Sequence, residues 1–181
     1  IDDLKEKIFC EKDVLIGITA SGRTPYVLSA LNYAKSINAL SISISSVPKC
    51  DSIFSADIDI RLITGPEVLA GSTRLKAGTA TKMALNIIST SVMIKLGRVY
   101  GNRMVDVSVT NDKLLKRALS ILLDIGSVDR ETGLKLLKKT NGSVKLSLLI
   151  ALSGLDLSKA KDVLDESEGN LRNALFKVCT D

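Results

Sequence analysis

The sequence contains no histidine and no tryptophan, and only 3% of its residues are aromatic. Without histidine, the chain cannot build a Ser-His-Asp or Cys-His catalytic group from its own residues, and a metal site of the zinc type is disfavoured. Any proton transfer by this chain would fall to Asp, Glu, Lys or Tyr. The scarcity of aromatic rings removes the stacking surfaces that bind single-stranded nucleic acid, so we expect no nucleic-acid partner.

Long apolar runs are also absent, so we expect no membrane span and no signal peptide. The cysteines Cys10, Cys50 and Cys179 lie far apart and form no CxxC pair, which favours reduced thiols in a cytoplasmic protein. The chain has 181 residues, of which 45% are hydrophobic and 25% charged, and a formal net charge of +5. These values are typical of one folded domain, with room for a small appendage.

The most informative stretch is an apolar segment of strand length, residues 14–19, that runs through the loop ASGRT into a helix. Thr24 is expected to cap this helix, and Pro25 suits its first position. A strand that turns through Ser-Gly into a helix points free N–H groups at one place, where an anion such as phosphate can bind. In the alternative, Ser21 and Thr24 only satisfy the backbone of an ordinary turn. The loop is neither a Walker A motif nor a dinucleotide fingerprint.

Two further strands are predicted, Ala39 to Ser45 and Asp57 to Ile63. The second alternates Ile and Leu with charged residues, which indicates one wetter face near a sheet edge. Strands and helices of these lengths predict a parallel sheet with crossover helices, in which ligands bind beyond the carboxyl ends of the strands. The ASGRT loop lies at such an end.

Residues 65–96 combine a basic, polar first half with a long helix from Thr79 to Leu96. Basic side chains in the first turn of a helix oppose its dipole, which favours an anion or an acidic partner there; the alternative is a solvated face. Glu67 is the only carboxylate of this loop. Near Lys76 it could position a hydroxyl group or move a proton, or it could be a surface residue of the turn.

Beyond a predicted strand from Arg103 to Val109, the chain is a series of capped helices. The expected pairs of cap and helix are Asn111 with 112–125, Asp129 with 130–140, Ser143 with 144–152, Ser158 with 159–166, and Asn170 with 171–178.

The segments ASGRTPYV and GPEVLAGSTRLKAGTATKMALNIISTSVMIKLGRVYGNRMVDVSVTNDKL resemble the N-acetylmuramic acid 6-phosphate etherase family, which belongs to the sugar isomerase (SIS) superfamily. The resemblance implies a three-layer α/β/α sandwich with a parallel sheet over residues 1–125, as a partial SIS domain. A small all-α bundle, similar to a ubiquitin-associated fold, would follow over residues 126–181. It also implies a phosphosugar pocket with two parts, a phosphate loop of Ser21, Gly22, Arg23 and Thr24, and a second group of Glu67, Ser72, Thr73 and Lys76.

The activity that the resemblance implies is that of a lyase. It cleaves the D-lactyl ether of N-acetylmuramic acid 6-phosphate, gives N-acetylglucosamine 6-phosphate and D-lactate, and needs no cofactor. The family implies a homodimer, for which the apolar, small-residue face of the helix from Thr79 to Leu96 is the candidate interface.

Family members carry on the order of a hundred further N-terminal residues, enough to complete the domain. These residues include one strand and two catalytic glutamates, so the catalytic groups are expected upstream of Ile1. This segment alone would then be inactive, and the strand from Val14 would lack cover. The alternative function is a non-catalytic, phosphosugar-sensing regulatory SIS domain.

Overall fold

The computed structural model describes residues 1–51 and 53–180. The chain divides into two compact units, residues 1–88 and 89–181. This division falls inside the long helix α3 (Lys76–Lys95), and the domain boundary after residue 125 stays a prediction.

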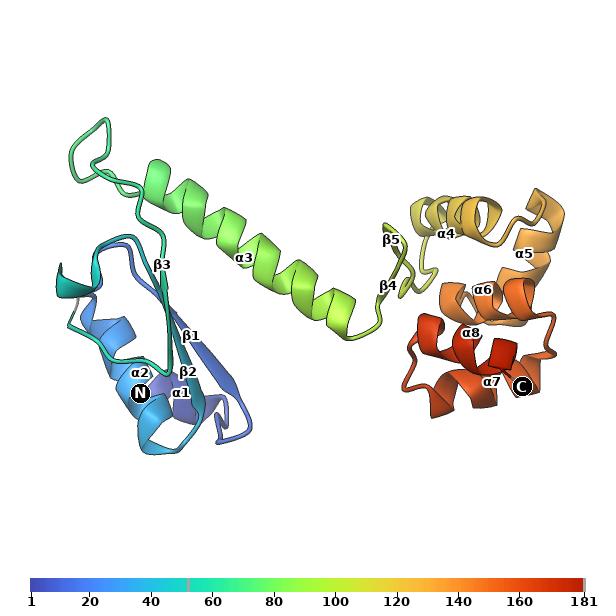
Figure 1. The fold of residues 1–181 in the computed structure, drawn as a ribbon, viewed down its shortest axis with the longest axis horizontal. Helices are drawn as coiled ribbons and strands as arrows, with labels where there is room; N and C mark the ends of the chain where they lie inside the picture. The colour runs from blue at the N-terminus through green and yellow to red at the C-terminus, as the bar shows by residue number, and fades with distance from the viewer. Residues whose placement is uncertain (52, 181) are drawn as a thin grey trace. The chain divides into compact units, whose positions relative to one another are not determined.

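The first unit is built on a three-stranded parallel sheet in the order β1-β2-β3 (Figure 1). Register is set by aligned triplets such as Gly17, Ser43 and Asp59, which lie opposite one another across the three strands. The predicted parallel α/β architecture, followed by a helical segment, is confirmed. The elements of this unit before α3 are α1 (Asp2–Glu6), β1 (Val14–Ile18), α2 (Pro25–Ser36), β2 (Leu40–Ser45), the 3₁₀ turn η1 (Lys49–Asp51) and β3 (Ile58–Arg61).

One face of the sheet is covered by α2. Gly17 on β1 allows this close packing, because a Cβ atom there would lie 2.9 Å from Val27 Cγ1 and 3.0 Å from Leu31 Cγ. Leu31 is completely buried. The helix therefore packs directly on the strand that leads into the ASGRT loop.

The same face carries a ladder of buried serines on β2. Ser41 Oγ donates to Asp57 Oδ2 at 2.6 Å, and Ser43 Oγ donates to Asp59 Oδ1 at 2.7 Å. Further along, Arg61 on β3 donates to the hydroxyl of the third serine of β2. These bonds explain the charged alternation of the third strand, since each charged side chain satisfies a buried hydroxyl group.

The opposite face of the sheet is aliphatic and largely uncovered. Val14, Ile16 and Ile18 of β1 are 52%, 36% and 42% exposed, and Ile58 of β3 is 45% exposed. Strands of a parallel sheet are normally covered on both faces. The expectation that the strand from Val14 lacks cover is thus confirmed, and β1 is an edge strand.

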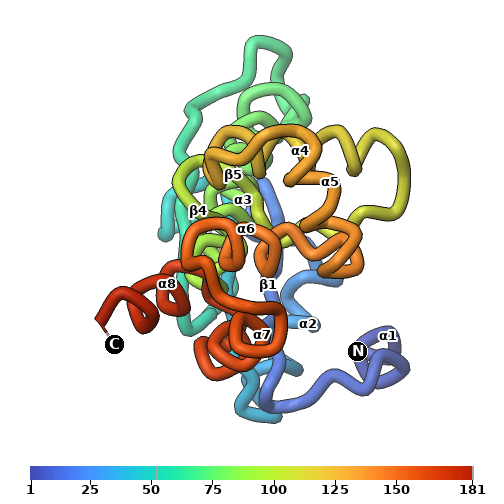
Figure 2. Tube along the Cα trace, turned by 90° about the vertical axis from the view of Figure 1, so that its right-hand side faces the viewer, coloured from blue at the N-terminus to red at the C-terminus, as the bar shows by residue number. Residues whose placement is uncertain are grey.

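The second unit is a helical bundle with α6 at its centre (Figures 1 and 2). Helix α6 contacts each of the other four helices, consistent with an almost wholly apolar sequence, VKLSLLIALS. Leu148 and Leu149 on α6 and Leu122 on α4 are completely buried. The elements are β4 (Val99–Tyr100), β5 (Arg103–Met104), α4 (Asp112–Ile125), α5 (Arg130–Lys139), α6 (Val144–Ser153), α7 (Leu157–Glu166) and α8 (Leu171–Thr180).

Most of the predicted helix caps in this unit are confirmed. Asn111, Asp129 and Ser143 each accept a hydrogen bond from the backbone N–H three residues later. The prediction that Ser158 precedes its helix is wrong. Helix α7 begins at Leu157, because the Asp156 carboxylate accepts the N–H of Lys159 and fills the cap position.

The predicted strand from Arg103 to Val109 is confirmed only at its first two residues. Only Arg103 and Met104 form a strand, β5, and it pairs antiparallel with β4 across the Gly101 turn. The backbone N–H of Val105 still donates to Arg98 O at 3.1 Å, while its side chain is completely buried in the helical core. Next to it, the Asp106 carboxylate forms ion pairs with Arg98 and with Lys145, the latter at 3.4 Å.

Candidate functional site

The start of the loop after β1 is held by two backbone hydrogen bonds to the end of β2. The backbone N–H of Thr19 donates to Ile44 O at 2.9 Å, and that of Ser46 donates to Ala20 O at 3.1 Å, so the loop is tied to the end of β2. Gly22 takes a positive φ of 69°, a conformation that suits glycine in a sharp turn. The predicted turn from strand to helix is therefore present at the carboxyl end of the sheet.

Thr24 occupies the N-cap position of α2, but the prediction that its side chain caps the helix is wrong. Its Oγ1 lies 2.7 Å from Oγ1 of Thr19, which is 5% exposed, and the two hydroxyl groups share a hydrogen bond. The first turn of α2 therefore keeps N–H groups that the Thr24 side chain does not use. Pro25 follows at the first helical position, as predicted.

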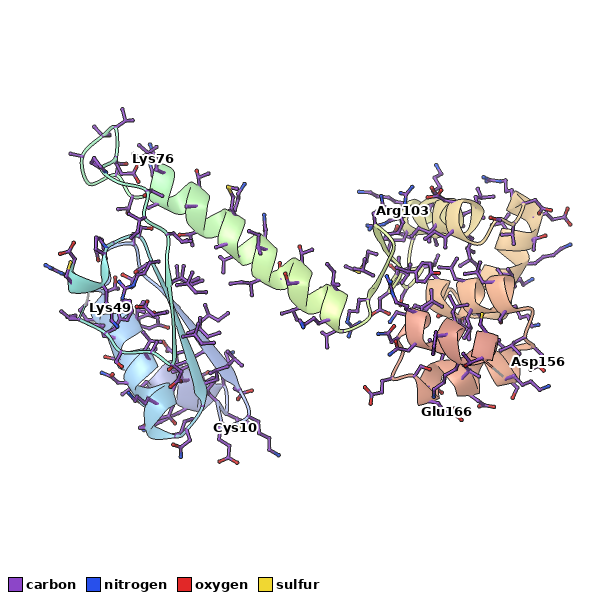
Figure 3. The ribbon with its side chains drawn as sticks, viewed as in Figure 1. Cys10, Lys49, Lys76, Arg103, Asp156 and Glu166 are labelled. Atoms are coloured by element: carbon purple, nitrogen blue, oxygen red, sulfur yellow. The ribbon has the colours of Figure 1, made fainter. Side chains whose placement is uncertain are left out.

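The other two polar residues of the loop differ in their surroundings. Ser21 is exposed, with its hydroxyl group at the surface of the turn. Arg23 Nε donates to Asp51 O at 3.0 Å, so this side chain ties the loop to η1. Figure 3 labels Lys49 in the same turn, which adds a second cation at this end of the sheet.

Ser46 is a further candidate residue at this edge of the sheet, and the sequence reasoning missed it. Its Oγ atom is buried and has no hydrogen-bond partner among the described residues, although its backbone holds Ala20. A buried hydroxyl group without a partner is unfavourable unless something else satisfies it. Its position in the sequence could have indicated it, because Ser46 directly follows the predicted strand that ends at Ser45, at the edge where ligands of parallel sheets bind.

Glu67 forms the N-terminal cap of α3. Its Oε2 accepts the N–H of Lys76 at 2.9 Å, and its Oε1 accepts the N–H of Ala77 at 3.0 Å. These backbone hydrogen bonds, first that of Ala77 and then that of Lys76, lower the pKa of Glu67, and the charge of Lys76 adds to the effect. The sequence favours an anion near the basic first turn of α3. The Glu67 carboxylate of the same chain is that anion.

The remaining residues of the second predicted group lie around this helix start. Ser72 is half-buried and its carbonyl oxygen accepts the N–H of Leu75 at 3.1 Å, within the turn that enters α3. Thr73 O accepts the N–H of Gly78 at 2.9 Å. Lys76 is exposed at the first turn of α3 (Figure 3).

A pocket of about 420 Å³ lies next to the ASGRT loop, but Ser21, Gly22, Arg23 and Thr24 are not among its described lining residues. It lies between the end of β1, at Ile18 and Ala20, and the first half of α3. Thr73 is the one member of the predicted set among its lining residues, and Ala20 directly precedes Ser21. The polar lining that was not predicted comes from α3 and consists of Thr81, Lys82 and Asn86.

The chemistry that this arrangement offers is recognition of an anion. Hydroxyl groups, the lysine of the pocket lining and N–H groups at the start of α2 can all donate hydrogen bonds. The lining residues that the structure describes include no carboxylate. Within residues 1–51 and 53–180, no cluster of three or more His, Cys, Asp or Glu side chains could hold a metal ion. In that same part of the chain, no helix is long and apolar enough to span a membrane.

Comparison with known proteins gives a consistent assignment. A family model for the SIS domain matches residues 9–91. The chain is 77% identical to an N-acetylmuramic acid 6-phosphate etherase of Prochlorococcus marinus (strain NATL1A), over 97% of this chain and 57% of that protein. The corresponding protein of strain NATL2A is 76% identical over 98% of this chain and 57% of its own length. That of Parasynechococcus marenigrum (strain WH8102) is 57% identical over 96% of this chain and 55% of its own length. The chain thus spans a little over half the length of these curated relatives.

Proposed function

We propose that the chain belongs to the N-acetylmuramic acid 6-phosphate etherase family and that it supplies the phosphosugar-binding part of such an etherase. The reaction is cleavage of the D-lactyl ether of N-acetylmuramic acid 6-phosphate, which gives N-acetylglucosamine 6-phosphate and D-lactate. The observation that carries the proposal is the identity of 77% over 97% of the chain to a relative of that name.

The proposed role of this chain is to hold the phosphorylated sugar while acid–base groups elsewhere act on it. One carboxylate would remove the proton alpha to the aldehyde of the opened sugar, and lactate would leave from the neighbouring carbon. Water would then add to the unsaturated intermediate, with a carboxylate as acid and base. Binding of the phosphate group orients the sugar for these steps.

We assign the phosphate to the ASGRT loop and the sugar to the pocket against α3. In this assignment the exposed hydroxyl group of Ser21, the Thr24 side chain and the first N–H groups of α2 would donate hydrogen bonds to the phosphate. Gly22 permits the turn, and Arg23 fixes it to η1. Thr73 reaches the same pocket as the end of β1, and Lys82 is its cation. Glu67, Ser72 and Lys76 shape the start of α3 and support this wall.

Glu67 is a poor candidate for proton transfer in this scheme. Both of its oxygens accept backbone N–H groups, and its pKa is lowered, so it is a stable anion near neutral pH. A general base that must take up a proton works best with a pKa near the working pH. We therefore propose that the chain binds the phosphosugar and that, on its own, it does not turn it over.

The test is a calorimetric titration of the chain with N-acetylglucosamine 6-phosphate and with N-acetylglucosamine. Replacement of Ser21 by Ala should weaken binding of the phosphorylated sugar about tenfold, because it removes a hydrogen bond to a charged group. It should hardly affect the unphosphorylated sugar. Ser29→Ala, an exposed serine on α2 outside the loop, is the matched control. Equal weakening for both sugars would exclude the loop as the phosphate site.

The regulatory alternative makes a different prediction for the longer protein. D-lactate release from N-acetylmuramic acid 6-phosphate by the longer protein supports the etherase. Binding without release supports a phosphosugar sensor.

We also propose that the protein forms a homodimer through α3. Met83, Ile87 and Ile94 lie on one side of this helix and are 56%, 66% and 54% exposed. An exposed apolar stripe of this kind is typical of an interface. Replacement of Ile87 by Lys should yield a monomer in light scattering, and an unchanged mass would contradict this interface.

A further inference from the structure

The second unit contains a pocket that the proposed phosphosugar site does not use. It has a volume of about 550 Å³ and lies between β5, α4 and the start of α5. Arg103 lies at its edge beside α4 (Figure 3). The described residues that line it are Arg103, Lys116, Leu119, Ser120, Leu123, Asp124 and Arg130.

The pocket carries an excess of positive charge. Three cations reach it from three separate elements, and Asp124 is the one acid among the described lining residues. Asp124 Oδ2 accepts Arg103 Nη2 at 2.8 Å and Nε at 3.2 Å, so this acid is already paired. Lys116 and Arg130 form no ion pair with the residues described. Two uncompensated cations therefore face one small volume.

Arg130 is an unfavourable residue for its position in the helix. It is the first residue of α5, where the helix dipole repels a cation by a few tenths of a kcal/mol, and Asp129 is occupied with the N–H of Thr132. A cation in this position becomes favourable when an anion binds beside it.

The rest of the lining suits a small organic anion. Ser120 adds a hydroxyl donor on the same side of α4 as Lys116, four residues away. Leu123, 40% exposed, offers an apolar surface next to these polar groups. The described lining residues include no aromatic side chain on which a nucleobase could stack.

We propose that this pocket binds a small phosphate monoester, with the phosphate between Lys116 and Arg130 and the organic part against Leu123. Arg103, held in place by Asp124, forms the remaining wall. The site belongs to the helical unit, so it would let a phosphorylated metabolite bind the protein separately from the ASGRT loop.

The experiment is a ¹H–¹⁵N NMR titration of the whole chain with glycerol 3-phosphate, with glycerol and inorganic phosphate as comparison ligands. NMR assigns each shift to a residue, so binding at Ser120 and Arg130 is distinguished from binding at residues 20–24. We expect saturable shifts at the amides of Ser120 and Arg130 with both phosphates and none with glycerol. Binding to residues 20–24 alone would overturn this proposal and leave the proposed function intact.

Charge substitutions complete the test. Lys116→Gln and Arg130→Gln should each weaken binding about fivefold, the scale of one partly screened charge-assisted contact. The matched control is Lys113→Gln, which removes the same charge from the same helix outside the pocket and should change affinity less than about twofold. All three side chains are exposed, so circular dichroism should show unchanged folding. Equal weakening by the control would show diffuse attraction to a basic surface and would overturn the proposal.

Discussion

Gly17 is a position at which a single added carbon atom would disturb the packing of the first unit. A Cβ atom at residue 17 would lie 2.9 Å from Val27 Cγ1 and 3.0 Å from Leu31 Cγ. Gly-to-Ala in a strand normally stabilises by about 0.5–1 kcal/mol, whereas overpacking a core costs about 1–3 kcal/mol. Because both contacts are side chains of the buried face of α2, the second effect should win. Gly17→Ala should therefore destabilise the first unit by about 1–2 kcal/mol.

A double-mutant cycle with Leu31 separates this explanation from a general effect on the strand. Leu31→Ala alone should cost about 2–5 kcal/mol, because the residue is completely buried. It also opens space beside residue 17, so Gly17→Ala should cost less in its presence, with a coupling energy of about 1 kcal/mol. Amide hydrogen exchange of β2 and α2 measures the effect, and amides of α6 in the second unit are the internal control. Strictly additive costs, or a stabilising Gly17→Ala, would refute the reasoning.

Two further predictions test the start of α3 and the helical core. Glu67→Gln should lower protection of the Lys76 and Ala77 amides against exchange at pH 7. In the native chain that protection should decline as pH falls through the lowered pKa of Glu67, below its ordinary value of 4.5, whereas the variant should show no such acid dependence. Leu148→Ala should destabilise the second unit by about 2–5 kcal/mol in urea, since this side chain on α6 is completely buried; a cost below about 1 kcal/mol would contradict the central position of α6.

Much of the fold could be predicted because local signals and tertiary packing agree. The strand at Val14, the turn through Gly22 and the helix from Pro25 follow from apolar run length, a turn residue and a proline. The caps at Asn111 and Asp129 follow from short-range chemistry that tertiary contacts leave intact.

The errors arose where tertiary contacts override a local pattern. The segment RMVDVSV alternates like a strand, but Val105 is buried among helices and Asp106 is bound by Arg98 and Lys145. A pattern of alternating residues is local, so it cannot reveal these ion-pair partners, of which Lys145 lies far from Asp106 in the sequence. The position of the α7 cap was also missed, because Ser158 and Asp156 are both suitable N-cap residues and the sequence alone does not choose between them.

The candidate site shows the same division between local and long-range information. The role of Ser21, Gly22, Arg23 and Thr24 stays a prediction, but as candidates they were accessible to sequence reasoning because they occupy one continuous loop after one strand. Ser46 was not, because its buried hydroxyl group matters only when β2 is placed beside β1 and its backbone reaches Ala20.

Glu67 shows that the anion expected near a basic helix start can be a side chain of the same chain and need not be a ligand. A basic first turn favours a nearby anion, and a carboxylate nine residues before Lys76 in the sequence provides it for α3. Because that anion is already part of the chain, the start of α3 needs no phosphate. The ASGRT loop, whose N–H groups the Thr24 side chain does not cap, is therefore the place that we propose for the phosphate.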